Sequence, residues 1–221
     1  MRRKINIVIL LLTLFSLFSL TAEPLNKEEV NEFDRFFMTP YSESLAIASE
    51  ITHVISLLSP ALLTLAADKY SYLEIGSLYV STIALTYGTT YLMKQNIPRE
   101  RPFAYFGQNS EATSNDSFPS GHTARSFAAA AYTQMVFSLR YPDSKAKLPV
   151  TIATWTMATA TAVLRVASSN HFVTDVLAGA AIGSLIGITI PLIASKTLSS
   201  WKKGDLNLAV SPNVIAFNLS Y

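Results

Sequence analysis

Cysteine and charge are the scarce features of this sequence. None of its 221 residues is a cysteine, which excludes disulfide bonds and thiolate metal sites. Charged residues make up only 14% of the chain, well below the roughly 25% that is usual in soluble domains. Half of the residues are hydrophobic, and the length is that of about one large domain. So little charge favours a membrane protein over an ordinary soluble domain.

The hydrophobic residues are gathered in long blocks with almost no ionisable side chains. Five such blocks cover residues 45–67, 72–93, 123–139, 148–164 and 176–194. Each is near the ~20 residues that a helix needs to cross a bilayer. The spacing of Gly179, Gly183 and Gly187 favours close helix packing in lipid. The blocks predict an all-α, polytopic bundle of five membrane spans. The alternative is the helical core of a soluble protein, which the two shortest blocks would also fit.

The N-terminus has the pattern of an export signal. Three cations at positions 2–4 precede the apolar run 5–20, and Ala22 offers a cleavage site. We expect residues 1–22 to be a cleaved signal peptide or a retained signal anchor, and both would export the segment after residue 22. Removing residues 1–22 lowers the basic residues from 17 to 14, against 15 acidic residues. The formal net charge of +2 therefore comes from the export signal and does not indicate a nucleic-acid partner.

The distribution of cations predicts an orientation, because lysine and arginine near the ends of spans stay on the cytoplasmic side. Four basic groups fall on one side of the predicted bundle, at residues 2–4, 69, 140–147 and 196–203. The other loops would then face outward. This predicts a protein of the bacterial inner membrane whose outward loops face the periplasm.

We expect a helical phosphatase domain over residues 23–200 and a separate tail over residues 201–221. Residues 24–44 carry an apolar stripe, which predicts a helix lying on the membrane surface or, nearly as well, a helix packed on the bundle. Residues 201–221 alternate apolar and polar side chains around Ser211-Pro212-Asn213. This alternation predicts a short C-terminal β-hairpin tail.

Three short patches, far apart in the sequence, carry residues suited to phosphate chemistry. In the last patch, His171 and Asp175 lie four residues apart and would share one face of a helix. A carboxylate there can accept the proton of one imidazole nitrogen, which leaves the other nitrogen more nucleophilic. Arg165 ends an otherwise uncharged block, and its guanidinium fork suits phosphate oxygens. A simple helix-surface pair is the alternative for His171 and Asp175.

The second patch is Pro119-Ser120-Gly121-His122, directly before an apolar helical run. Ser120 is a good N-cap, and Gly121 lets the backbone approach a ligand. The N–H groups at a helix start bind anions. His122, in the first turn, can give a proton to a leaving oxygen or take one back. The alternative is a plain capped helix with a surface histidine.

In the first patch, Lys94 closes an apolar run and Arg101-Pro102 follows seven residues later. Both cations could instead extend to the membrane interface without any further role. Each patch is weak alone, but together they hold three cations, two histidines and a carboxylate. That set suits holding a phosphate and passing it through a covalent histidine, because phosphoryl transfer needs positioning and charge neutralisation.

Taken in order, the patches resemble the signatures of the type 2 phosphatidic acid phosphatase superfamily. This superfamily includes membrane lipid phosphatases, soluble bacterial acid phosphatases and vanadium haloperoxidases. The resemblance covers about residues 45–194, and the matching segments are Lys94–Pro102, Pro119–His122 and Arg165–Asp175. Leu164 is a departure, since the family usually has a small hydroxyl residue before the arginine. We therefore expect a secondary polar contact to differ.

The resemblance implies a role for each residue of the patches. His171 would attack phosphorus and form a phosphohistidine, and Asp175 would orient His171. His122 would protonate the leaving group and then help to activate water. The phosphate oxygens would be held by Lys94, Arg101, Ser120, Gly121 and Arg165. Because fixed cations would take the place of a metal, we expect neither a metal nor another cofactor.

The sequence thus predicts a metal-independent histidine phosphatase that hydrolyses a phosphomonoester or diphosphate on a membrane lipid, at the periplasmic face. The expected substrates are phosphatidate, phosphatidylglycerol phosphate, undecaprenyl diphosphate or lipid A. The nearest alternative is a soluble periplasmic acid phosphatase, which would be extracted without detergent. A non-catalytic lipid-binding membrane protein is a further alternative, and it would bind lipid without releasing phosphate.

Overall fold

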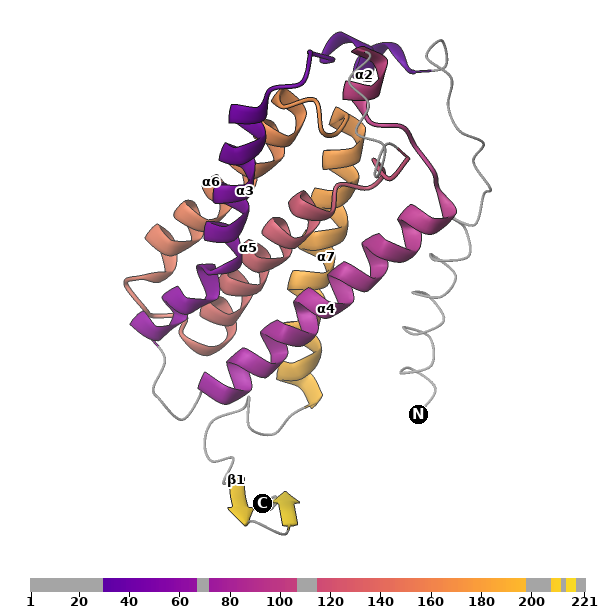
Figure 1. The fold of residues 1–221 in the computed structure, drawn as a ribbon. Helices are drawn as coiled ribbons and strands as arrows, with labels where there is room; N and C mark the ends of the chain where they lie inside the picture. Colours follow the sequence, from indigo (N-terminus) through magenta and orange to yellow (C-terminus); the bar gives the residue numbers. More distant parts are fainter. Residues whose placement is uncertain (1–29, 67–71, 107–114, 198–207, 212–213, 218–221) are drawn as a thin grey trace.

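The computed structural model describes most of the helical domain and a small part of the C-terminal tail. The described residues are 30–66, 72–106, 115–197, 208–211 and 214–217. The predicted signal segment, residues 1–22, lies outside them, as does Lys69. The long helices of the described chain lie side by side in one bundle (Figure 1).

The helical elements of the described chain follow the predicted apolar blocks. They are α2 (Glu32–Phe36), α3 (Glu43–Leu57), η2 (Ser59–Leu65), α4 (Tyr72–Asn96), η4 (Pro102–Phe106), α5 (Gly121–Arg140), α6 (Lys147–Ala167) and α7 (Val173–Thr197). The first block coincides with α3 and its continuation η2, and the other four coincide with α4, α5, α6 and α7. The predicted all-α bundle is therefore confirmed.

Three helices in the described part of the chain are long and apolar enough to cross a membrane, judged by length and composition. They span Glu43–Leu65, Lys147–Ala167 and Val173–Thr197. The outward faces of the long helices also expose large apolar side chains, among them Ile51, Val54, Leu73, Val80, Ile152, Val163, Leu177 and Leu185. Large apolar side chains exposed along the outer faces of long helices are suited to contact with lipid.

The two other long helices, α4 and α5, are less apolar, and for them the predicted crossing stays a prediction. In α4, Thr82, Thr86 and Thr90 donate hydrogen bonds to the carbonyls four residues earlier, at 2.8, 2.8 and 3.1 Å. Hydroxyl groups paired in this way do not need water. Helix α5 packs against α3, α4, α6 and α7, and its segment 128–132 is almost completely buried. Because protein surrounds α5, its composition need not resemble that of a lipid-facing helix.

Helices α5 and α7 approach each other closely along a row of small residues. A Cβ atom added to Gly179 would lie 2.5 Å from the Ser120 carbonyl oxygen, and one added to Gly187 would lie 2.5 Å from the Ala128 carbonyl oxygen. A Cβ on Gly183 would overlap the Ala124 carbonyl. The glycines of α7 therefore accept the backbone of α5 directly, and the close packing predicted from their spacing is confirmed.

The ends of the described chain carry two smaller features. Helix α2 exposes an aromatic face, with Phe36 82% exposed, while its Asp34 is buried against the bundle. One face of α2 thus packs on the bundle, which is one of the two predicted arrangements, and the other face is apolar and uncovered. A position on the membrane surface stays a prediction. At the other end, β1 (Leu208–Ser211) pairs antiparallel with β2 (Val214–Phe217), as the alternation predicted.

The glycine contact yields a test of the packing. We expect Gly183→Ala to destabilise the protein by about 1–3 kcal/mol, since the added methyl group must push α7 away from α5. Gly88→Ala is the matched control, because Gly88 is also inside a long helix but a Cβ there meets nothing within 4 Å. That variant should be neutral or gain about 0.5–1 kcal/mol from helix propensity. Thermal unfolding in detergent measures both, and equal stability of the two variants would contradict the described packing.

Candidate active site

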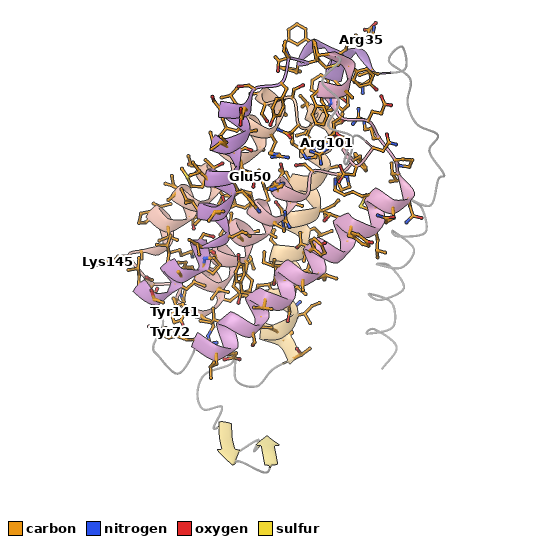
Figure 2. The ribbon with its side chains drawn as sticks, in the orientation of Figure 1. Arg35, Glu50, Tyr72, Arg101, Tyr141 and Lys145 are labelled. Carbon is orange, nitrogen blue, oxygen red and sulfur yellow. The ribbon has the colours of Figure 1, made fainter. Side chains whose placement is uncertain are left out.

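The three patches meet at one end of the bundle. There α4 and α6 end and α5 and α7 begin, so residues from distant parts of the sequence are brought together. Figure 2 shows Arg101 and Glu50 toward this end, and Tyr72, Tyr141 and Lys145 toward the other. The basic residues Arg140, Lys145 and Lys147 thus lie away from the patches.

His171 is the buried centre of the site, with 1% of its surface exposed. Its Nδ1 lies 2.8 Å from the backbone carbonyl oxygen of Ser117. A carbonyl only accepts hydrogen bonds, so Nδ1 carries the proton and the lone pair of the ring is on Nε2. Burial, together with the charges of Arg101, Arg165 and Lys94, holds the pKa of His171 well below its usual value of 6.5. The imidazole is therefore neutral at physiological pH.

Asp175 is fully buried, and its carboxylate is held by several donors. Its Oδ2 accepts hydrogen bonds from Ser117 Oγ at 2.5 Å and from the Phe172 N–H at 2.9 Å. Its Oδ1 pairs with Arg99. The distance from Oδ2 to His171 Nδ1 is 3.7 Å, so the direct hydrogen-bond partner of the imidazole is the Ser117 carbonyl. Ser117 thus connects the carboxylate to the histidine through its hydroxyl and its carbonyl.

Arg99 and Asp34 extend this network, and the sequence patterns did not identify either residue. Both are buried, and Arg99 Nη2 lies 2.7 Å from Asp34 Oδ2. Asp34 also accepts hydrogen bonds from Thr174, at 3.0 Å from its N–H and 2.5 Å from its hydroxyl. Burial opposes ionisation of Asp34, but the hydrogen bonds from Thr174 and Arg99 outweigh it and lower its pKa. The Arg99 guanidinium therefore bridges two buried carboxylates, Asp34 and Asp175.

Two of the predicted phosphate-binding cations share one carboxylate, that of Asp116. Arg101 donates to Asp116 Oδ1 from Nε at 3.0 Å and from Nη2 at 2.7 Å. Lys94 donates to the Asp116 backbone carbonyl, and its Nζ lies 3.8 Å from the carboxylate. The Asp116 side chain is partly exposed, so it can exchange these contacts with solvent or a ligand.

The third predicted cation, Arg165, is buried at the end of α6. Its Nη1 lies 3.1 Å from Glu50 Oε1 and 3.2 Å from Ser49 Oγ, both on α3. Its Nε is buried and has no hydrogen-bond partner among the described residues. A buried N–H without a partner is costly, and a phosphate oxygen would supply the missing acceptor.

The second patch forms the start of α5, as predicted. Ser120 caps the helix, because its Oγ accepts a hydrogen bond from the Thr123 N–H at 3.4 Å. The N–H of Ser120 itself donates to the Asp175 carbonyl at 3.0 Å, so this donor already has a partner. His122 Nε2 lies 3.1 Å from the Glu50 carboxylate. The ring of His53 meets the His122 ring edge-on, with centroids 4.5 Å apart.

The arrangement suits one kind of chemistry. A neutral imidazole with a free Nε2 lone pair lies within the electrostatic reach of three fixed cations, and a second histidine begins the neighbouring helix. Such a site can hold a tetrahedral anion next to a nucleophile. Among the residues that the structure describes, no group of three or more histidines and carboxylates is arranged to hold a metal ion.

Comparison with known proteins agrees with the family resemblance. The family model described as "PAP2 superfamily" matches residues 76–198, which are more than half of the chain and include all three patches. A lipid A 1-phosphatase from Porphyromonas gingivalis is 33% identical over 105 residues, which are 48% of this chain. The chain covers only 20% of the length of that relative.

Two crystal structures are similar to the bundle at low sequence identity. One is a transmembrane PAP2-type phosphatidylglycerolphosphate phosphatase from Bacillus subtilis. It has 20% identity and a TM-score of 0.41, and the match covers 72% of this chain and 90% of the other. The second is LpxE of Aquifex aeolicus, with 22% identity, a TM-score of 0.48, and coverage of 75% and 93%.

Proposed function

Because the chain belongs to the PAP2 superfamily, we propose that it is a membrane phosphatase that removes phosphate from a lipid phosphate or lipid diphosphate through a covalent phosphohistidine. The observation that carries the proposal is the environment of His171. A buried, neutral imidazole whose Nδ1 is fixed on a carbonyl presents Nε2 as a nucleophile, and three cations act on the same position. Nucleophile and anion-binding charge are therefore combined in one place.

In the first step, His171 Nε2 attacks the phosphorus atom, and the bond from phosphorus to the leaving oxygen breaks. Lys94, Arg101 and Arg165 neutralise the charge on the equatorial oxygens, with help from the backbone near Ser120 and Gly121. His122 gives a proton to the leaving alcohol or phosphate. The product is a phosphohistidine and a free lipid alcohol or monophosphate.

In the second step, water attacks the phosphohistidine and inorganic phosphate leaves. His122, which has lost its proton, accepts one from this water and is restored. The role of Asp175 is indirect, since it holds Ser117, and the Ser117 carbonyl holds Nδ1 of His171. The fixed cations perform the charge neutralisation that a metal would supply, so the reaction should need no metal.

The substrate class is supported by two features. The site lies at the end of helices that are suited to lipid, so a headgroup can reach it while the acyl or prenyl chain stays in the bilayer. The curated relative that shares 33% identity is named as a lipid A 1-phosphatase, which favours a lipid phosphate.

The nucleophile can be tested directly. We expect His171→Ala and His171→Gln to lower phosphate release from a lipid phosphate by about 10³-fold or more, because the attacking atom is removed. Glutamine keeps an amide N–H that can donate to the Ser117 carbonyl, so this variant should remain folded. Phosphate release by detergent-purified protein in the presence of a chelator gives the rate. Near wild-type activity in either variant would contradict the covalent mechanism, and a requirement for divalent ions would contradict the proposed metal independence.

We further propose that the site faces the periplasm, because Arg140, Lys145 and Lys147 lie at the opposite end of the bundle. The chain contains no cysteine, so single cysteines can be introduced cleanly. In intact cells, a thiol reagent that crosses only the outer membrane should label Gln95→Cys, at the site end of α4. It should not label Asp143→Cys, between α5 and α6. Labelling in the reverse pattern would invert this orientation, and labelling of both would favour a soluble periplasmic protein.

A further inference from the structure

Glu50, on α3, contacts two members of the candidate site, and the two-step mechanism gives it no role. Its carboxylate lies 3.1 Å from His122 Nε2 and 3.1 Å from Arg165 Nη1. The side chain is 51% exposed, and Figure 2 shows Glu50 on α3, on the same part of the bundle as Arg101. In the sequence, Glu50 is an ionisable residue within an otherwise apolar block. A charged group in such a block is costly unless it has a partner or a function.

The electrostatic surroundings of His122 make this contact important. The charged and titratable groups that act on it from the neighbouring elements are Arg165 of α6, Arg125 of α5, His53 of α3, and His171 ahead of α7. Burial, which has the largest effect, and all of these groups oppose a positive charge on the His122 ring. In the described chain, Glu50 is the one carboxylate within hydrogen-bond distance of that ring. A general acid must carry a proton before it can give one away, and Glu50 is placed to favour that state.

The two ring nitrogens of His122 have different surroundings. Nε2 is held by Glu50, and the His53 ring lies edge-on against the imidazole. His53 is itself fixed by a 2.9 Å hydrogen bond between its Nδ1 and Ser126 Oγ. With Nε2 engaged in this way, Nδ1 is the nitrogen of His122 left to face a substrate.

We propose that Glu50 is the positioning residue of the general acid His122, holding its imidazolium form with Nδ1–H directed at the leaving oxygen. This inference rests on the proposed phosphatase function. As the bond from phosphorus to the leaving oxygen breaks, the Nδ1 proton moves to that oxygen, and the neutral ring keeps its Nε2–H on Glu50. When water attacks the phosphohistidine, its proton returns to Nδ1, and the imidazolium paired with Glu50 is restored.

The pairing with Arg165 gives Glu50 a second effect. The same carboxylate contacts the acid and one of the cations proposed to hold the phosphate. The proposed proton donor, His122, and the proposed phosphate-binding residue, Arg165, are thus held relative to each other by one side chain. Glu50→Gln keeps the size of the side chain and a hydrogen-bonding group but removes the charge, so it distinguishes an effect of the charge from an effect of packing.

The test compares Glu50→Gln with Glu74→Gln. Glu74 pairs with Arg140 at 2.8 Å at the opposite end of the bundle, so this control also removes one negative charge, but far from the site. Each variant is assayed with a lipid phosphate, whose alkoxide leaving group needs a proton, and with 4-nitrophenyl phosphate, whose leaving group does not. The pH dependence of kcat on the lipid substrate is recorded in parallel.

For Glu50→Gln we expect kcat on the lipid to fall by about 10²-fold, within the range typical of general acid catalysis. The high-pH limb of the kcat profile should shift to lower pH, because the imidazolium has lost its counter-charge. Activity on 4-nitrophenyl phosphate should change by no more than a few-fold. Glu74→Gln should match the wild type in all three measurements.

Three results would overturn the proposal. An equal loss on both substrates would assign Glu50 a merely structural role. A lower KM with unchanged kcat would mean that Glu50 competes with phosphate for Arg165. Full activity of Glu50→Gln on the lipid, with an unshifted pH profile, would show that Glu50 does not act on His122. If 4-nitrophenyl phosphate is a poor substrate, this comparison on the lipid alone tests the proposal. If the wild type and Glu74→Gln released no phosphate from any lipid tested, the proposed function itself would fail, which is a distinguishable outcome.

Discussion

The site depends on the close contact between α5 and α7. Because Gly179, Gly183 and Gly187 lack side chains, the backbone of α5 lies directly on α7. This contact brings the start of α5 against the start of α7, where the Ser120 N–H meets the Asp175 carbonyl. The second and third patches are therefore joined by backbone packing before any catalytic side chain is considered. Wider spacing of the two helices would separate His122 from His171 and the cations around it.

Charge balance is the second organising feature. Each cation of the site is matched by a carboxylate: Lys94 and Arg101 by Asp116, Arg165 by Glu50, and Arg99 by both Asp34 and Asp175. These carboxylates differ in burial, so the ion pairs are of two kinds. Asp34 and Asp175 are buried and hold the architecture, since removing one partner of a buried pair leaves an uncompensated charge. Asp116 is partly exposed, so its exchange for a ligand of Lys94 and Arg101 costs less, whereas Glu50, which is also partly exposed, contacts His122 as well as Arg165.

The helices and the patches were predictable from the sequence, whereas the connections between them were not. Apolar blocks and the four-residue glycine spacing are local patterns that report on helix length and packing. The partners of the patches carry no such signal. Ser117 holds His171 through a backbone carbonyl, which any residue type could offer. Asp34 meets Arg99 across 65 residues of sequence, and Glu50 meets Arg165 across 115, so their pairing follows from helix arrangement. The five-span count stays a prediction for α4 and α5, because a helix such as α5 that is covered by protein need not be as apolar as one that faces lipid.

The central claim is that His171 becomes covalently phosphorylated, and trapping the intermediate tests it most directly. Purified protein would be mixed with a lipid substrate carrying a radioactive phosphate and quenched rapidly in alkali, in which phosphohistidine survives. A covalent mechanism predicts label on the peptide that contains His171, and none in a His171→Ala variant. Phosphate release with no trapped label, together with inversion of configuration at a chiral phosphorus, would contradict it, because inversion indicates a single direct attack by water.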